Sequence, residues 1–408
     1  MATSIGSNAF VGCTNLTSVN LPVATSIGTG AFSNCTSLTS VSFPAATSIG
    51  SQAFGGCTSL TSVSFPAATS INDYAFGRCN SLINFTVTGD GSLEVTEGGK
   101  ALTRNIAGGK ELVAYPSASG SITIDYITSI GSDAFRECTS LTSVSLPAAT
   151  SIGQRAFRSS TSLTSVSLPA ATSIGHEAFW NCTNLESVDL PEVTSIGGDA
   201  FANCTSLSNV DLPEVTSIGG DAFANCTSLS NVDLPAATSI GSNAFRQCTS
   251  LSSVSFPAAT SIGSNAFGGC TSLTSVSLPV ATSIGNSAFS GCTSLTSVNL
   301  PVVTSIGNYA FSSVFTTALT ITLGENRPTV GTAIFNNVYS TKDVTVKIPV
   351  DANKADYGFD ETKLGNFDND SENNWGWAFR GAGWDGTSYL TGPVNTNIVL
   401  SFETYEVD

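Results

Sequence analysis

A 22-residue unit that recurs along the chain decides the fold. Its clearest copy, residues 261–282, reads Ser261-Ile-Gly-Ser-Asn-Ala-Phe-Gly-Gly-Cys-Thr-Ser-Leu-Thr-Ser-Val-Ser-Leu-Pro-Val-Ala-Thr282. The phenylalanine of each copy stands 22 residues from the next, first at Phe10, Phe32, Phe54 and Phe76 and then, after one longer gap, from Phe135 to Phe311. This spacing gives thirteen copies. A fixed period of this length indicates a repeat architecture.

The unit contains two different apolar periods. From Ile262 to Leu273 the apolar residues fall three or four apart, which predicts a short helical or 3₁₀ segment. Val276 and Leu278 are two apart, which predicts a strand with one buried face that ends at Pro279. Such a unit cannot bury its apolar face alone, so we expect copies to stack in register, isoleucine on isoleucine and phenylalanine on phenylalanine.

The recurring string Leu-x-x-Val-x-Leu-Pro, followed by Ile-Gly-x-x-Ala-Phe-x-x-Cys, resembles the BspA-type, or Treponema pallidum-type, leucine-rich repeat. The resemblance covers residues 1 to about 315, with a period of 22 where the family usually has 23. It implies a mainly β leucine-rich-repeat solenoid with a parallel sheet on the concave side and short helical or 3₁₀ turns on the convex side. It also implies an exported bacterial surface protein that binds hosts, matrix proteins or other cells.

Composition limits the partners. Charged residues make up 11% of the chain and the formal net charge is −16, so the clusters of Lys and Arg that bind nucleic acid are not expected. No apolar run reaches the length of about 18 residues that a membrane span needs, so we expect no membrane insertion. Met1 falls in the middle of a repeat, so we expect the natural protein to extend further toward its N-terminus. An uncapped first rung would expose backbone and apolar core, which favours self-association.

The cysteines all occupy one slot of the repeat. Each of the eleven lies three residues after the repeat phenylalanine, and Ser160 and Val314 take this slot in the two remaining units. A slot that accepts Cys, Ser or Val fits a small buried residue better than a disulfide partner or a metal ligand. We therefore expect buried free thiols, with occasional disulfides and soft-metal sites as the alternatives, and we expect no cofactor.

Two interruptions divide the chain. The spacing between Phe76 and Phe135 is 59 residues, and Gly-rich turns between alternating runs predict a β-hairpin insert at 84–127 that separates the repeats 1–83 from the repeats 128–315. The insert is interpreted as a structural spacer or as a binding loop. The repeat ends near Phe315, and residues 316–408 are expected to form a β-rich C-terminal cap. Its Trp375, Trp377 and Trp384 either pack inside the cap or stack on sugars.

Catalytic residues are scarce. The single histidine, His176, stands at a turn position that other repeats fill with Ser, Gln, Gly or Asn, so neither a catalytic triad nor a multi-histidine zinc site is expected. The glycines recur as Ile-Gly once per unit and reflect backbone geometry rather than a phosphate loop. We therefore expect no catalytic residues, no metal site and no enzymatic activity.

One outward strand position varies between repeats. It lies between an inward Val and an inward Leu, and it holds Ser or Asn in most units, including Ser167 and Ser255, but Asp189, Asp211 and Asp233 in three consecutive ones. Stacked carboxylates repel one another, which a basic ligand or Ca²⁺ would relieve. Duplication of nearly identical repeats is the alternative explanation.

The leading hypothesis is an extracellular or cell-surface bacterial adhesion protein. Its concave surface, at Asp189, Asp211, Asp233, Ser167 and Ser255, would bind a host or matrix protein, another cell surface or a glycan. Affinity would come from many modest polar contacts. The alternatives are a structural spacer or surface-layer component, and carbohydrate binding through the tryptophan-rich C-terminal module.

Overall fold

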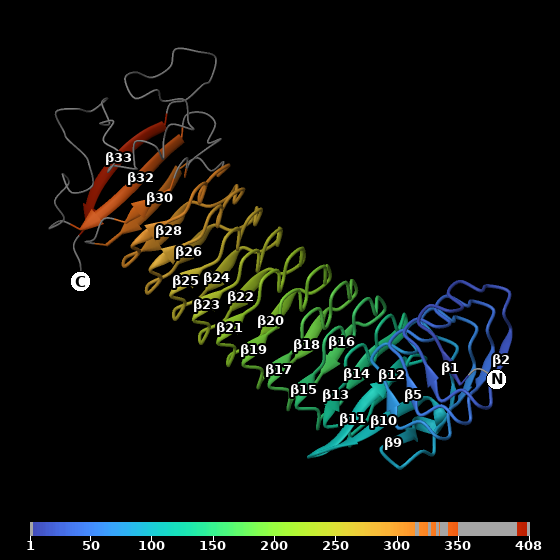
Figure 1. Ribbon diagram of the computed structural model, residues 1–408. Helices are drawn as coiled ribbons and strands as arrows, with labels where there is room; N and C mark the ends of the chain where they lie inside the picture. Colours follow the sequence, from blue (N-terminus) through green and yellow to red (C-terminus); the bar gives the residue numbers. More distant parts are fainter. Residues whose placement is uncertain are drawn as a thin grey trace. The chain divides into compact units, whose positions relative to one another are not determined.

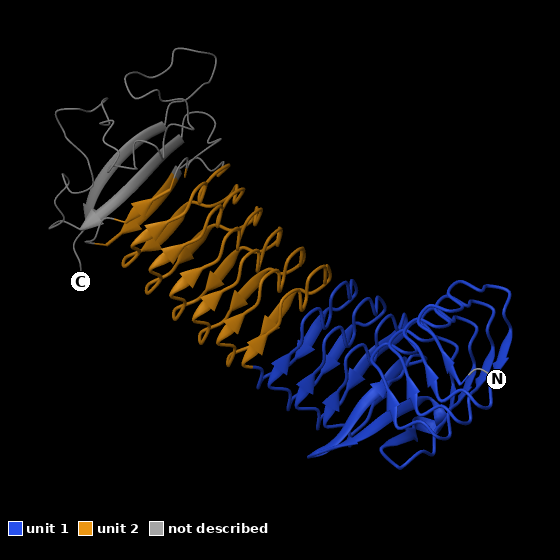
Figure 2. Ribbon diagram, viewed as in Figure 1, with its two compact units in different colours: residues 1–193 blue, residues 194–408 orange. Residues whose placement is uncertain are grey.

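The computed structural model describes residues 3–314, 318–324, 328–331, 334, 342–349 and 398–405, the last two ranges and Ala318 as backbone alone. The chain divides into two compact units, unit 1 at Met1–Val193 and unit 2 at Thr194–Asp408 (Figure 2). Trp375, Trp377 and Trp384 lie outside the described residues, as does most of the predicted cap.

Each repeat forms one turn of a parallel β-solenoid, which we call a rung. A rung carries a two-residue strand that reads Ser-Ile and a strand of three or more residues that reads Ser-Val-Ser or a close variant. Both strands pair in parallel with their equivalents 22 residues away, as in Ile152↔Ile174 and Val144↔Val166. The ribbon shows these short strands stacked side by side within each unit (Figure 1). The predicted mainly β solenoid and the in-register stacking of its repeats are confirmed.

Unit 1 contains four ladders of strands. Before the insert they are β1 (Ser4–Ile5), β3 (Ser26–Ile27), β5 (Ser48–Ile49) and β7 (Ser70–Ile71), beside β2 (Ser18–Asn20), β4 (Ser40–Ser42), β6 (Ser62–Ser64) and β8 (Asn84–Thr86). After it they are β11 (Gly109–Ala114), β13 (Ser129–Ile130), β15 (Ser151–Ile152) and β17 (Ser173–Ile174), beside β12 (Ser119–Thr123), β14 (Ser140–Ser145), β16 (Ser165–Ser167) and β18 (Ser187–Asp189).

Unit 2 repeats the arrangement. Its Ser-Ile ladder is β19 (Ser195–Ile196), β21 (Ser217–Ile218), β23 (Ser239–Ile240), β25 (Ser261–Ile262), β27 (Ser283–Ile284), β29 (Ser305–Ile306) and β31 (Thr329–Val330). Its other strands form two sheets, β20 (Asn209–Asp211), β22 (Asn231–Asp233) and β24 (Ser253–Ser255), then β26 (Ser275–Ser277), β28 (Ser297–Leu300), β30 (Ala318–Leu323), β32 (Lys342–Pro349) and β33 (Ile398–Tyr405).

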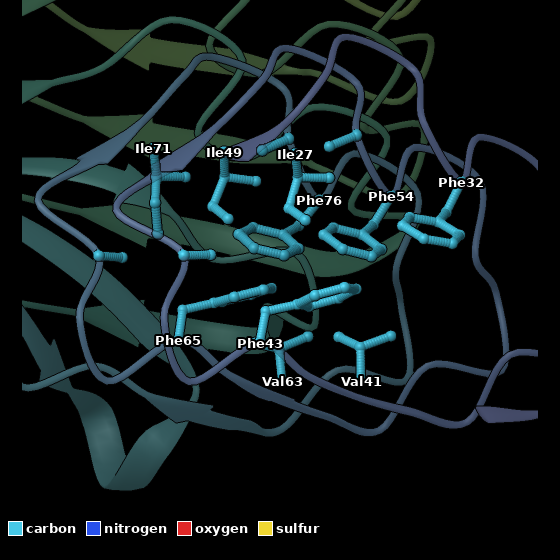
Figure 3. Packing of buried hydrophobic residues seen from close by; sticks show 14 of the residues in the cluster. Ile27, Phe32, Val41, Phe43, Ile49, Phe54, Val63, Phe65, Ile71 and Phe76 are labelled. Atoms are coloured by element: carbon cyan, nitrogen blue, oxygen red, sulfur yellow. The ribbon is translucent and has the colours of Figure 1, made fainter. Parts of the chain in front are cut away.

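The core consists of columns of identical side chains. Within each unit, successive repeat phenylalanines stack with ring centroids 4.9–5.7 Å apart and planes within 2–9° of parallel. Figure 3 shows Phe32, Phe54 and Phe76 in one such column, with Phe43 and Phe65 beside it. Burial of a phenylalanine contributes about 1.5–3 kcal/mol and each stacked pair about 0.5–1.5 kcal/mol more. These contacts form only when neighbouring rungs stack in register, so the stability of the column depends on that register.

The segment expected to be helical is a series of turns instead. Cys57 N–H bonds to Phe54 O and Gly55 N–H to Gln52 O, but Gln52 and Gly56 adopt positive φ, at 55° and 77°. Two left-handed residues four apart recur in each rung and prevent helical propagation. In return, the amides of Phe54 and Gly56 bond to carbonyls of the next rung. The one 3₁₀ helix among the described residues, η1 (Glu97–Gly99), lies in the insert.

The cysteine column is built from hydrogen bonds. The cysteines are free thiols, buried except for Cys13. A buried thiol donates to the phenylalanine carbonyl of the preceding rung, 3.2 Å for Cys57 to Phe32 and 3.1 Å for Cys226 to Phe201. Ser160 makes the same bond to Phe135 O at 2.7 Å. This position therefore requires a small side chain. A thiol or hydroxyl there donates a hydrogen bond to the buried phenylalanine carbonyl of the preceding rung.

The insert supplies a modified rung. Strands β9 (Leu93–Thr96) and β10 (Ala101–Ile106) form antiparallel pairs that end at β11, and β11 pairs in parallel with β13. Tyr115 takes the phenylalanine slot, because its amide bonds to Ala134 O at 2.9 Å and its carbonyl accepts from Cys138 Sγ at 3.3 Å. Strand β8 pairs in register with β6 and so continues the ladder of β2, β4 and β6. Its residues were expected from the sequence to lie in the insert.

Candidate binding surface

In unit 1 the outward side chains of β12, β14, β16 and β18 form the surface that we call the serine face. They make two polar columns on either side of the inward Val144 and Val166: Ser121, Ser143, Ser165 and Ser187 in one, and Thr123, Ser145, Ser167 and Asp189 in the other. These residues line an open hollow of about 320 Å³, together with the aliphatic side chains between the columns, Ile122, Val144, Val166 and Val188. Parallel strands lie about 4.8 Å apart, so the hydroxyls form a regular grid.

Threonine and serine have different roles in a rung. The threonines that precede the strands donate their hydroxyls to the backbone of the preceding rung, as in Thr164 Oγ1 to Thr142 O at 2.9 Å and Thr150 Oγ1 to Thr128 O at 3.1 Å. The serines on the strands point into the hollow. Threonine hydroxyls therefore stabilise the stack. Serine hydroxyls bond within the face, Ser121 with Ser143 and Ser167 with Asp189, and keep further donor or acceptor capacity for a partner.

Asp189 gives the serine face its negative charge. It is exposed on β18, and its Oδ2 accepts a hydrogen bond from Ser167 Oγ at 2.8 Å. Ser167 is half-buried and lies opposite Asp189 in the strand register. Thus the structure brings these two of the five predicted strand residues into contact.

Unit 2 carries the other three predicted strand residues. Asp211 and Asp233 are register partners on β20 and β22, and Asp233 faces Ser255 on β24. All three are exposed. Two unit charges about one strand spacing apart repel each other by about 1 kcal/mol in water. Because solvent keeps this repulsion small, the paired carboxylates can be accommodated without a bound cation. Within the described ranges no group of three His, Cys, Asp or Glu is arranged to hold a metal ion.

Burial suppresses thiol chemistry. Burial raises the pKa of Cys57, Cys138, Cys182, Cys248 and Cys292 to about 12. A thiol with such a pKa stays protonated at neutral pH, and the thiolate is the nucleophile and metal ligand. His176 is exposed on the turn side, with Nε2 3.8 Å from Glu177 Oε1. The buried cysteines therefore contribute to packing.

A group of charged and aromatic residues on the turn side of unit 1 was not predicted from the sequence. Arg136 and Arg158 lie against the rings of Tyr74 and Trp180, and Glu137 bonds to the Tyr74 hydroxyl. The available signal was that Arg, Glu, Tyr and Trp occupy turn positions that most other repeats fill with smaller or neutral polar residues such as Asn, Gly, Ser, Ala or Gln.

The sequence matches the family described as BspA type leucine rich repeat region over residues 2–96, 117–204, 172–282 and 260–374. The chain belongs to the BspA-type leucine-rich repeat family. Repeat solenoids of this kind typically serve as binding scaffolds. No helix in the described part of the chain has the length and hydropathy needed to cross a bilayer.

Three solved structures are similar to this chain. A leucine-rich repeat protein from Bacteroides ovatus shares 27% identity with this BspA-type chain at a TM-score of 0.57, covering 88% of this chain and 86% of that one. One from Eubacterium ventriosum shares 24% identity at a TM-score of 0.50, covering 71% and 80%. A leucine rich cell surface protein from Faecalibacterium prausnitzii shares 26% identity at a TM-score of 0.43, covering 76% and 89%. Comparison with curated proteins finds no match.

Proposed function

We propose that this BspA-type protein is an exported bacterial surface protein that binds a partner through the serine face. The hollow of about 320 Å³ between β12 and β18 carries the proposal, because it combines a polar grid with a rigid backbone. The grid is preorganised, since each strand is fixed by its neighbours and the threonine hydroxyls are already bonded to the stack. Little conformational entropy is then lost on binding.

The chemistry of the surface defines the partner. Hydroxyls both donate and accept, and Asp189 adds one strong acceptor at the end of the hollow. The hollow lacks the aromatic side chains on which sugars or bases stack. We infer that the partner is a protein surface, presented by a host cell, a matrix or another bacterium, with donors that match the grid. Affinity at one site would be modest and would rise with many copies on a cell.

A blocking variant tests the proposal. Arrays of matrix proteins and glycans, followed by cell attachment, identify the retained partner. Ser145→Tyr with Ser167→Tyr fills the hollow, and Ser42→Tyr with Ser64→Tyr places the same side chains in the same column of β4 and β6 as a matched control. We expect at least a tenfold loss of binding, about 1.4 kcal/mol, for the first pair and none for the second. Equal binding by both pairs refutes the assignment of the site.

The competing function is that of a structural spacer or surface-layer component, which the regularity of the rungs favours. It predicts that neither tyrosine pair changes attachment and that shortening the repeat region does. If the unaltered protein retains a matrix protein and the Ser145→Tyr, Ser167→Tyr variant does not, the spacer function is contradicted.

A further inference from the structure

A second surface of unit 1 stands out on the turn side of the rungs that flank the insert. We call it the arginine patch. It consists of Arg78, Arg136, Arg155 and Arg158, with Tyr74, Trp180, Asp133, Glu137, His176 and Glu177. Only 14 of the 408 residues are Lys or Arg, so four arginines on neighbouring rungs are a strong local enrichment.

The patch has two arginines that reach into solvent. The carboxylates lie lower, with side-chain exposures of 5% for Asp133, 22% for Glu137 and 20% for Glu177, and Arg136 at 17% and Arg158 at 23% lie beside them. The most exposed arginines are Arg78 at 57% and Arg155 at 39%. These two guanidinium groups are therefore the ones that a partner reaches first, on a protein whose formal net charge is −16.

Aromatic rings and ion pairs hold the arginines in place. The guanidinium of Arg136 lies 4.0 Å from the centre of the Tyr74 ring, and that of Arg158 lies 4.1 Å from the centre of the Trp180 ring. Arg78 Nε lies 2.7 Å from Glu137 and Arg155 Nε lies 3.2 Å from Glu177. Cation–π contacts and ion pairs of this kind reduce the side-chain entropy that a binding partner must remove.

The backbone under the patch is strained. Tyr74, Arg78, Glu137, Arg155 and Glu177 all adopt positive φ, between 55° and 62°. The same two positions of other rungs hold Asn, Asp, Gly, Ser or Gln, with Tyr309 as the exception. A bulky residue in this region costs about 1 kcal/mol or more. Five such residues within four rungs indicate that the side chains serve a purpose other than rung geometry.

A purely structural role explains part of this cluster. Tyr74 and Arg78 precede the insert and bond to Glu137 after it, at 3.1 Å and 2.7 Å, so they join the two repeat blocks. Arg155, Arg158, His176 and Trp180 lie one and two rungs further on and do not bridge the insert. They extend the same surface along the stack, beyond what joining the blocks requires.

We propose that the arginine patch binds the carboxylates of an acidic segment of a partner protein, independently of the serine face. A guanidinium is a planar fork that matches a carboxylate, and Arg with Tyr and Trp is the composition that dominates protein interfaces. Because acidic groups prevail in the rest of the chain, an acidic segment is directed to this patch. The most exposed arginines, Arg78 and Arg155, make the first contacts.

A labelled hexaglutamate peptide tests the proposal with the full chain, by fluorescence anisotropy at low salt. Arg78→Ser with Arg155→Ser removes the exposed guanidiniums. Arg246→Ser with Lys100→Ser makes the same change in net charge at two residues that take no part in the contacts that define the patch. We expect at least a tenfold weaker affinity for the first pair, an unchanged affinity for the second, and a loss of binding as salt is raised.

Three results would overturn the proposal. The first is that the unaltered protein does not bind hexaglutamate. The second is that both double variants lose the same affinity for hexaglutamate. The third is that dextran sulfate binds more tightly than hexaglutamate at equal anionic charge. Arg78→Lys with Arg155→Lys keeps the charge and removes the fork, so it covers the case in which the serine pair misfolds. We expect it to retain the unfolding temperature and to lose at least threefold in affinity, and unchanged affinity contradicts fork recognition.

Discussion

Removal of one ring from the phenylalanine column should destabilise unit 2 severely. Phe223 is completely buried, and its ring stacks between Phe201 at 5.1 Å and Phe245 at 5.2 Å. Phe→Ala in a core costs about 3–5 kcal/mol, and the two lost ring contacts, each about 0.5–1.5 kcal/mol, place Phe223→Ala near the upper end of that range. The rungs on either side cannot collapse into the cavity without losing their own register.

Urea denaturation followed by far-UV circular dichroism measures this loss. Val280→Ala is the matched control, because Val280 is 41% exposed in the same unit and should change stability by less than about 0.5 kcal/mol. Hydrogen exchange of the peptide at 217–238 shows whether the weakening is local to that rung. A loss below about 1 kcal/mol for Phe223→Ala, or one equal to that of the control, would refute the role of stacked columns.

Three further predictions follow from buried polar groups. A maleimide should label Cys13 rapidly and the ten buried thiols only after unfolding, as counted by mass spectrometry; rapid labelling of Cys57 would contradict its pKa of about 12. Ser160→Val should lose about 1–3 kcal/mol on urea denaturation, because Ser160 Oγ donates to Phe135 O and accepts from Cys138 N–H, whereas Ser160→Cys should be nearly neutral. Burial raises the pKa of Asp133 despite its contact with Arg136. The folded state then binds more protons than the unfolded state. The contribution of Asp133 to the free energy of unfolding should therefore fall as pH rises from the unfolded pKa through the folded pKa. Asp133→Asn should remove this dependence on pH.

Periodicity alone predicted the strand register. A side chain at one position must meet its equivalent 22 residues away, as Ile218 meets Ile240, because no other pairing buries the apolar face of a short rung. It also identified the outward position of Asp211 and Asp233, since strand residues alternate between faces. The partner of that surface has no such signature and remains a proposal.

Backbone conformation and long-range contacts were beyond the sequence reasoning. The apolar spacing of the turn segment fits a helix, but the left-handed residues that break it, such as Gln52 and Arg155, are marked only by weak preferences. The arginine patch depends on the insert, which brings Tyr74 to Glu137 across 63 residues. Neither the substitution of Tyr115 for a repeat phenylalanine nor this contact follows from a regular period.

Removal of one complete rung shows whether each repeat is an independent unit of the stack. Because Ser217 and Ile218 pair with Ser239 and Ile240, deleting residues 217–238 joins Thr216 to Ser239 in the same register. We expect a folded protein with unchanged ellipticity per residue and cooperative urea unfolding, whereas deleting residues 217–227, half a repeat, should abolish the sheet signal. If the complete-rung deletion unfolds the protein, or if the half-rung deletion is tolerated equally well, the rungs are not independent stacked units.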